Sequence, residues 1–306
     1  TEQRIFTSWK TNADSTVYFD PDGRLGLYIQ QSNGNYDWKR SSALHRDVSA
    51  WYHIVAVWDS SNATADDRMR LYVNGERITA FDNSINPAQN DGACFFDSTC
   101  THYIGRAITA NLFWDGYLAE VNVIDGQALD ATSFGEAKGG TWIPKSYSGS
   151  YGTNGFHLEF NGNTNDTSGN GNNWTANNIS ASDYVPDSPT NNFATLNVLT
   201  KGTSNTTLAE GNLKANGVAS GSGSNWGTVF SSHLLPTTGK YYVEGLAFIN
   251  TGSGNNSHLG VLDTSSFRPS NGNITYAYTT GEGFDGIYIS LFNNNARPIS
   301  DGVFGT

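Results

Sequence analysis

The sequence predicts an all-β protein with two domains, and three observations support this. The 306 residues exceed the roughly 100 to 200 residues of one typical domain. Aromatic residues make up 13% of the chain, which is enough apolar surface to offset the conformational entropy lost on folding. Charged residues make up only 15%, whereas the 34 glycines accompany many Asn, Ser and Thr residues, a composition typical of short strands joined by tight turns.

Apolar and alternating stretches predict the strands of the first half. In chain order these strands are expected at 4–9, 16–19, 25–30, 51–58, 68–73, 76–79, 102–105, 116–124 and 155–160. Both faces of the 51–58 stretch are largely apolar, so we expect a central strand covered on both sides, with His53 as a structural residue in it. Asn74 and Gly75 supply the two positive φ angles of a type I′ hairpin turn. Helix is nearly absent, apart from about one turn that Asp130 caps.

The second half begins after a region rich in turn-forming residues. Residues 161–178 are mostly Asn, Gly, Ser and Thr, which predicts a surface loop anchored by Trp174. The stretch 184–190 has two prolines and few groups able to join a sheet, so we expect domains at 1–185 and 190–306. Strands of the second domain are predicted at 226–230, 239–248, 257–262 and 286–292.

The charge of the chain argues against two classes of partner. Lys and Arg number 17 and Asp and Glu 28, so the net charge is −11, which repels phosphate backbones and anionic membranes. We therefore expect no nucleic-acid partner, and the lack of a run of about 18 apolar residues predicts no membrane insertion. The sequence has no basic segment followed by an apolar one at its start, so no signal peptide is expected. It starts without Met and enters strand-like sequence almost at once, from which we expect a fragment of a longer polypeptide.

The two cysteines, Cys94 and Cys100, have no Cys-x-x-Cys partner and no nearby pair of His residues, which argues against a zinc site. A disulfide that closes one short loop is the first interpretation, and a pair of free thiols is the alternative. A disulfide would also imply exposure to an oxidising exterior.

Four motifs in order carry a resemblance to a known family. They are WYHIV at 51–55, LYVNG at 71–75, YIGR at 103–106 and FWDGYLAEVNV at 113–123. Together they resemble laminin-G-like domains of the concanavalin A-like lectin superfamily, over about residues 1–180. The resemblance implies a jelly-roll sandwich, and the expected fold is therefore a concanavalin A-like jelly roll followed by a second β-sandwich.

Two other resemblances concern the rest of the chain. WGTV at 226–229, TGKYYVE at 238–244 and HLGV at 258–261 resemble the opening half of a SPRY domain over about residues 195–306, whose closing strands are not visible. This resemblance implies an incomplete second β-sandwich used for binding. Segments such as WIPK at 142–145 and NNFATLN at 191–197 are similar to segments of tail and fibre-like proteins of marine bacteriophages.

The superfamily also contains glycoside hydrolases with a Glu-x-Asp-x-Glu strand, in which alternation brings two carboxylates to one face. The nearest match here runs from Glu120 to Asp125, with Asn122 at the second acidic position. Because a middle carboxylate is missing, a secreted glycan-processing hydrolase is the alternative interpretation and a non-enzymatic protein the first one.

Several laminin-G domains bind calcium at a loop rim, and hard oxygen ligands suit this ion. The donors here would be Asp20, Asp22, Asp66, Asp67 and the loop around Asp166. The alternative is that each acidic residue only caps its own turn. Calcium therefore stays an open expectation with unassigned ligands, and no other cofactor is expected.

Sugars bind by stacking an apolar face on an aromatic ring, while Asn and Asp side chains take the hydroxyl groups. The candidate ligand-binding residues are Tyr36, Trp38, Phe113 and Trp114. The alternative is that all four pack inside the sandwich, and this is the first interpretation for Trp114.

Together these features predict a non-enzymatic virion or surface-appendage protein of the tail-fibre or decoration type, located in the virion or outside the cell. Expected partners are other virion or appendage subunits, including copies of the same chain, and a host-surface glycan or protein. A purely structural decoration protein without glycan affinity is a further alternative.

Overall fold

The computed structural model describes residues 1–47, 50–108, 112–185, 188, 194–198, 206–217, 229–231, 256–262, 286–292 and 295–300. The chain forms two compact units, Thr1–Phe193 and Ala194–Thr306. All regular secondary structure in the described residues is β-strand or short 3-10 helix, so the predicted all-β class is confirmed. None of these helices is long and apolar enough to cross a membrane.

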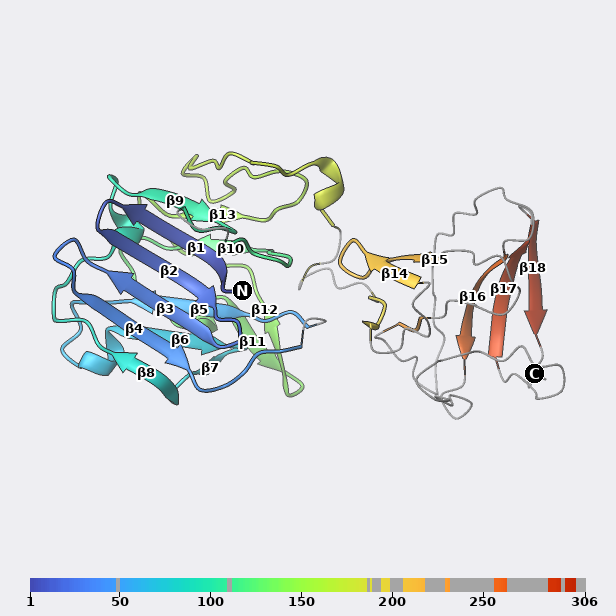
Figure 1. Cartoon of the computed structure of the whole chain (residues 1–306), viewed down its shortest axis with the longest axis horizontal. Coiled ribbons are helices and arrows are strands. Elements are labelled where there is room, and N and C mark those ends of the chain that lie inside the picture. The colour runs from blue at the N-terminus through green and yellow to red at the C-terminus, as the bar shows by residue number, and fades with distance from the viewer. Residues whose placement is uncertain are drawn as a thin grey trace. The chain divides into compact units, whose positions relative to one another are not determined.

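The first unit is built on a six-stranded antiparallel sheet in the order β8-β4-β3-β2-β1-β9 (Figure 1). Its strands are β1 (Gln3–Lys10), β2 (Ala13–Phe19), β3 (Leu25–Gln30), β4 (Tyr36–Ser41), β8 (Phe81–Ile85) and β9 (Thr101–Ile104). β2 and β3 combine alternating apolar residues with a short connection, so they pair at the centre of the sheet with Val17 opposite Leu27.

A second antiparallel sheet contains β5 (Ile54–Trp58), β6 (Met69–Val73) and β7 (Glu76–Arg77). Two smaller pairs follow, β10 (Val121–Val123) with β13 (Phe156–Leu158) and β11 (Gly135–Lys138) with β12 (Thr141–Pro144). The short helices are Ala65–Asp67, Cys94–Phe96, Ala131–Ser133 and Ala181–Asp183. Asp130 caps the helix Ala131–Ser133 as predicted, since its Oδ1 accepts a hydrogen bond from the Thr132 backbone N–H at 2.9 Å.

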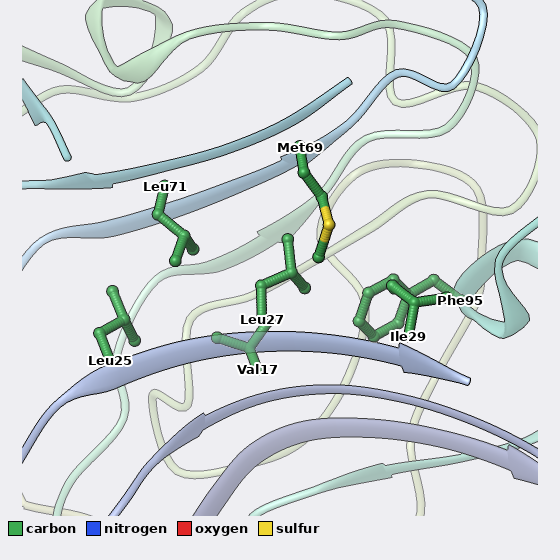
Figure 2. Close-up of a cluster of buried hydrophobic side chains, with 7 residues drawn as sticks. All are labelled: Val17, Leu25, Leu27, Ile29, Met69, Leu71 and Phe95. Carbon is green, nitrogen blue, oxygen red and sulfur yellow. The ribbon is translucent and has the colours of Figure 1, made fainter. Parts of the chain in front are cut away.

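The core lies between the two sheets. It consists of Val17, Leu25, Leu27, Ile29, Met69, Leu71 and Phe95. In Figure 2, the side chains of β3 point toward Met69 and Leu71 of β6. Alternation along β3 therefore turns three large apolar residues to the core and leaves the residues between them on the opposite face. This packing, together with the two sheets, is a β-sandwich, as predicted.

The strand predicted at 51–58 differs from the expectation. β5 begins at Ile54 and lies at the edge of the order β5-β6-β7, and Ala56 is exposed, so the strand is neither central nor covered on both sides. His53 lies before it, where its backbone N–H donates to Asn74 Oδ1 at 2.9 Å and its carbonyl accepts from the Asn74 N–H at 2.8 Å. These bonds tie residue 53 to the hairpin turn instead of extending the strand.

The hairpin turn itself is as predicted. Asn74 and Gly75 have φ angles of 50° and 84°, and Val73 pairs with Glu76 across the turn. The strand predicted at 116–124 is shorter, because Glu120 has a φ of 54°, which interrupts the extended conformation before Val121.

Cys94 and Cys100 form a disulfide with a Cα–Cα distance of 6.0 Å, as the first interpretation predicts, and are not free thiols. Residues 161–178 contain no strand, and Trp174 anchors them as expected, with its ring centroid 5.0 Å from that of Phe156 and 6.2 Å from that of Phe6.

The second unit contains a hairpin of β14 (Thr206–Ala209) and β15 (Lys214–Gly217). A three-stranded antiparallel sheet follows, with β16 (Asn256–Leu262), β17 (Gly286–Phe292) and β18 (Asn295–Ser300). The strands predicted at 257–262 and 286–292 are present. The strand predicted at 239–248 and most of the one at 226–230 lie outside the described residues.

Candidate functional site

The candidate site lies on the outer face of the six-stranded sheet, which is the face opposite to the core. Residues directly opposite each other in an antiparallel pair share a face, so the register identifies its members. Arg4 pairs with Tyr18, and Tyr28 pairs with Trp38. Tyr36 precedes Trp38 by two residues and joins the same face. These pairs place the rings of Tyr18, Tyr28, Tyr36 and Trp38 and the guanidinium group of Arg4 on the outer face. Arg40, which pairs with Gly26, adds a second guanidinium group.

Tyr18 forms the floor of this face. Its ring lies across Gly26, where an added Cβ would be 2.3 Å from Tyr18 Cε1, so only glycine leaves room for it. Trp38 Nε1 donates a hydrogen bond to Tyr18 Oη at 2.7 Å. Burial raises the pKa of Tyr18 to about 12, although the Trp38 hydrogen bond opposes the shift. The phenol is thus neutral at physiological pH and held in place.

A hollow of ≈ 180 Å³ opens above this floor, lined by Glu2, Arg4, Tyr18, Tyr28 and Trp38. The Arg4 guanidinium lies over the Tyr18 ring, with Cζ 5.2 Å from the centroid. Its Nε is 2.5 Å from Glu2 Oε1, which forms an ion pair.

The other end of the Arg4 guanidinium is not fully bonded. Nη1 is 3.8 Å from Asp14 Oδ2, too far for a hydrogen bond. Within the described residues, neither Arg4 Nη1 nor Asp14 Oδ1 has a hydrogen-bond partner, although both atoms are buried. Burial raises the pKa of Asp14 more than the Arg4 charge lowers it. Such groups have unused capacity to bond a ligand.

Aromatic contacts form the wall of the hollow. The Tyr28 ring stacks on Tyr36 with centroids 5.9 Å apart and meets Trp38 edge-on at 6.2 Å. Arg40 covers part of Trp38, with Cζ 5.1 Å from the ring centroid, and its guanidinium binds both carboxylate oxygens of Asp82 at 2.9 and 2.8 Å. Tyr36 remains 47% exposed, so a ligand has open access to the aromatic surface.

The structure separates the four candidate aromatic residues into two places. Tyr36 and Trp38 lie together on β4, at the outer face. Phe113 and Trp114 follow β9, and three strands separate β4 from β9 in the sheet order. Trp114 packs on Phe19 with ring centroids 6.0 Å apart, which agrees with the interpretation that this residue packs in the sandwich. Phe113 is 54% exposed and lies under Arg106. The two pairs therefore do not form one site.

Sequence reasoning missed the other residues of the hollow, which are Glu2, Arg4, Tyr18 and Tyr28. A signal was present in the stretch 25–30. A glycine at position 26 between apolar core residues is typical of a strand that another side chain crosses closely.

The carboxylates of the hydrolase-like stretch have other partners. Glu120 Oε2 lies 2.8 Å from His157 Nε2, and Asp125 Oδ2 accepts from the Asn154 backbone N–H at 3.1 Å and its Nδ2 at 2.8 Å. Since Glu120 lies outside the strand at positive φ, simple alternation does not bring it to the same face as residue 122.

The acidic residues considered for calcium bond groups of their own neighbourhood. Asp20 Oδ1 accepts the backbone N–H groups of Asp22 and Arg24, at 2.9 and 2.8 Å. Asp66 accepts from Asn86 and Asp67 pairs with Arg77. No group of three or more His, Cys, Asp or Glu side chains is arranged to hold a metal ion in the described parts of the chain.

His53 has a structural environment. Its Nδ1 accepts a hydrogen bond from Trp142 Nε1 at 3.0 Å, which places the proton of the neutral ring on Nε2. Burial lowers the pKa of His53, so the imidazole stays neutral at physiological pH.

Comparison with known families identifies the first part of the chain. Residues 1–133 match the family model described as the concanavalin A-like lectin/glucanases superfamily. These residues therefore form a concanavalin A-like domain, and the match ends earlier than the expected limit near residue 180. No curated protein and no solved structure matches the chain.

Proposed function

We propose that this chain is a non-enzymatic glycan-binding protein and that the hollow of the outer face is its binding site. The observation that carries the proposal is the combination of Tyr28 and Trp38 with the buried, partly unbonded guanidinium of Arg4. A concanavalin A-like domain over residues 1–133 fits carbohydrate binding.

The chemistry of the hollow suits a sugar ring. One apolar face of a pyranose would stack on Tyr28 or Trp38, while one hydroxyl group would accept a hydrogen bond from the Arg4 guanidinium and another would donate one to the Glu2 carboxylate. The volume of ≈ 180 Å³ is below the roughly 300–1,000 Å³ of most small-molecule sites. The hollow would therefore hold one ring of a longer glycan, whose remaining rings lie along the exposed Tyr36.

Non-enzymatic binding is the better supported mechanism. Glycoside hydrolysis needs two facing carboxyl groups, about 5 to 9.5 Å apart. Glu120 and Asp125 instead bond His157 and Asn154. If the chain nevertheless cleaves a glycan, Glu120→Gln would abolish cleavage and leave the fold intact.

The proposal extends to the biological setting. We infer a virion or surface-appendage protein that assembles with copies of itself and with other subunits and contacts a host-surface glycan. An acidic, glycine-rich β-protein with a disulfide suits exposure outside the cell. Mass spectrometry of purified virions and surface appendages tests this setting, and absence of the chain from every such preparation would contradict it.

A glycan array tests the binding function. The 306-residue chain is applied to an array of microbial-surface and plant polysaccharides, together with Trp38→Ala and Trp38→Phe. We expect Trp38→Ala to weaken the strongest signals about tenfold, which is about 1.4 kcal/mol. Trp38→Phe, which keeps a ring and loses only the bond to Tyr18, should retain most of the signal.

Phe113→Ala is the matched control, because it removes an exposed aromatic ring that lies outside the strands of this sheet and does not line the hollow. Its signals should equal those of the unmodified chain. An array without any signal contradicts glycan binding, and a loss with Phe113→Ala instead of Trp38→Ala contradicts the assignment to the outer face.

A further inference from the structure

The first unit has a second hollow, of ≈ 280 Å³, that shares no lining residue with the outer-face hollow. We call it the loop pocket, because residues 172–174 of the loop 161–178 line it. Its apolar part is made by Phe6, Phe95, Phe156 and Trp174. The Phe6 ring centroid lies 5.4 to 6.4 Å from those of the other three, so the four rings form one continuous aromatic surface.

The loop side of the pocket is fixed by its own hydrogen bonds. The Trp174 backbone N–H donates to the Thr164 carbonyl at 3.1 Å, and Thr164 Oγ1 donates to the Trp174 carbonyl at 2.7 Å. The Asp166 carboxylate accepts the backbone N–H groups of His157, Ser168 and Asn172 at 2.8 to 2.9 Å. A pocket held in this way loses little entropy when a ligand binds.

The polar atoms of the pocket have a definite orientation. Asn172 Nδ2 donates to the carbonyl oxygens of Thr153 and Gly155, and Asn154 Nδ2 donates to the Asp125 carboxylate. Carbonyl and carboxylate oxygens only accept hydrogen bonds, so the amide nitrogen of each side chain must be the donor. The Oδ1 atoms of Asn154 and Asn172 are therefore free to accept a hydrogen bond from a ligand. Neither Oδ1 has a hydrogen-bond partner among the described residues.

Two other side chains add to this set. His102 Nε2 lies 2.9 Å from the Phe95 carbonyl oxygen, so in the neutral ring Nε2 carries the proton and Nδ1 is an open acceptor. Asn173 Oδ1 accepts the Asp166 backbone N–H, which leaves its Nδ2 as a donor. These side chains thus offer three acceptors and one donor beside the aromatic surface. The hydroxyl of Ser98, which also lines the pocket, can both donate and accept, so the pocket favours a ligand with several O–H groups.

The pocket has no unbalanced charge. Asp97 is the one acidic residue among those that line it, and it forms an ion pair with Lys10 Nζ. The Lys10 ammonium, together with the Thr99 hydroxyl and N–H, holds the pKa of Asp97 well below its usual range. A charged ligand would find no counter-ion there, whereas a neutral polyol needs none.

We infer that the loop pocket is a second binding site, which takes one ring of a neutral saccharide. Hydroxyl groups of the ring donate to Asn154, Asn172 and His102, and its apolar face packs on the aromatic surface. The inference rests on the proposed function only in that the chain binds glycans; the site, its residues and its selectivity for neutral sugars are separate.

Saturation-transfer difference NMR on the 306-residue chain tests the inference. The probes are methyl glucoside, methyl galactoside and methyl mannoside at millimolar concentration, with glucuronic acid and glucosamine as charged comparators. Ser98→Trp fills the pocket from its exposed rim, and Ser98 makes no side-chain hydrogen bond in the described residues. We expect at least one neutral glycoside to bind and Ser98→Trp to reduce its signal at least tenfold. Ser148→Trp, which adds the same ring at an exposed serine that lines neither hollow, is the matched control and should leave the signal unchanged.

The same spectra of Tyr28→Ala separate the two sites. A neutral-glycoside signal that persists in Tyr28→Ala and disappears in Ser98→Trp supports the loop pocket, whatever happens at the outer face. A signal that persists in Ser98→Trp overturns the inference, as does the absence of binding by every neutral glycoside. Equal binding of the charged comparators overturns the proposed selectivity.

Discussion

Glu120 has a backbone φ of 54°, a left-handed conformation that glutamate seldom adopts. Its carboxylate lies 2.8 Å from His157 Nε2, while Thr167 Oγ1 lies 2.8 Å from His157 Nδ1. The Tyr151 ring stacks on the imidazole, with the ring centroids 6.2 Å apart. Glu120 before β10, Tyr151 before β13 and Thr167 of the loop 161–178 therefore meet at one histidine of β13.

This arrangement predicts a pH dependence of stability. The hydrogen bond to Glu120 raises the pKa of His157, against the effect of burial, and the charges of Glu120, Glu159 and Asp166 add to the rise. The folded pKa is above the unfolded value of about 6.5. The stabilisation is therefore complete below about pH 6.5 and is lost as the pH rises through the folded pKa.

Thermal unfolding between pH 5 and 9 measures this effect, with Glu120→Gln as the comparison. The melting temperature of the unmodified chain should fall more steeply above pH 6.5 than that of Glu120→Gln, whose amide cannot stabilise the imidazolium. Parallel pH profiles would contradict the pairing.

Gly26 provides a second prediction for a single residue. An alanine Cβ at this position would lie 2.3 Å from Tyr18 Cε1, so the ring would have to leave the floor of the outer face. Gly26→Ala should destabilise the protein by about 1 to 3 kcal/mol, as overpacking usually does. Denaturant unfolding measures the change. Gly92→Ala is the control, because nothing lies within 4 Å of its added Cβ. Equal stabilities of the two variants would refute the close contact.

Among the elements, the hairpin of β6 and β7 has the most local origin. Asn74 and Gly75 adopt the positive φ angles that their residue types favour. An added Cβ at Gly75 would also lie 2.3 Å from Trp142 Cε3. Asn74→Ala combined with Gly75→Val should therefore lower the free energy of unfolding by a few kcal/mol. An unchanged melting temperature would exclude the type I′ turn. Asn90→Ala changes another residue at positive φ outside the hairpin, so the stability it loses measures the effect of an alanine at positive φ alone.

The strands differ in how well their sequence predicts them. The stretches 25–30 and 286–292 match β3 and β17 residue for residue, because apolar runs between turn residues are a local signal. β4 was missed because its buried face carries Asp37, Lys39 and Ser41. Lys39 Nζ donates to the Asp66 carbonyl at 3.2 Å, and Gln31 Nε2 donates to Asp37 at 3.0 Å. Polar residues become buried when such distant partners bond them, and these partners cannot be read from a local pattern.

Prediction of the candidate site was limited in the same way, because distant partners cannot be read from a local pattern. Tyr36 and Trp38 could be selected as aromatic residues in a polar stretch. Arg4 and Tyr18 could not, because their place beside Trp38 depends on the register of four strands. Register is a property of the sheet as a whole.

The whole chain divides at residues 193 and 194, just after a stretch that contains Pro186 and Pro189. We predict that limited proteolysis cuts first between 180 and 196 and leaves a folded product that contains the concanavalin A-like domain. Mass spectrometry of the early fragments locates the cut, and a first cut within 51–78 would contradict two separable units. Residues 1–185, expressed alone, should unfold cooperatively, and failure of this product to fold would likewise show one continuous domain.

The central claim is that the outer-face hollow binds a glycan through its aromatic wall. Calorimetric titration of the 306-residue chain with the glycan selected on the array measures this most directly, in the unmodified protein, Tyr28→Ala and Phe113→Ala. We predict that the dissociation constant rises about tenfold in Tyr28→Ala and is unchanged in Phe113→Ala, with similar melting temperatures for all three proteins. An unchanged dissociation constant for Tyr28→Ala would contradict the claim.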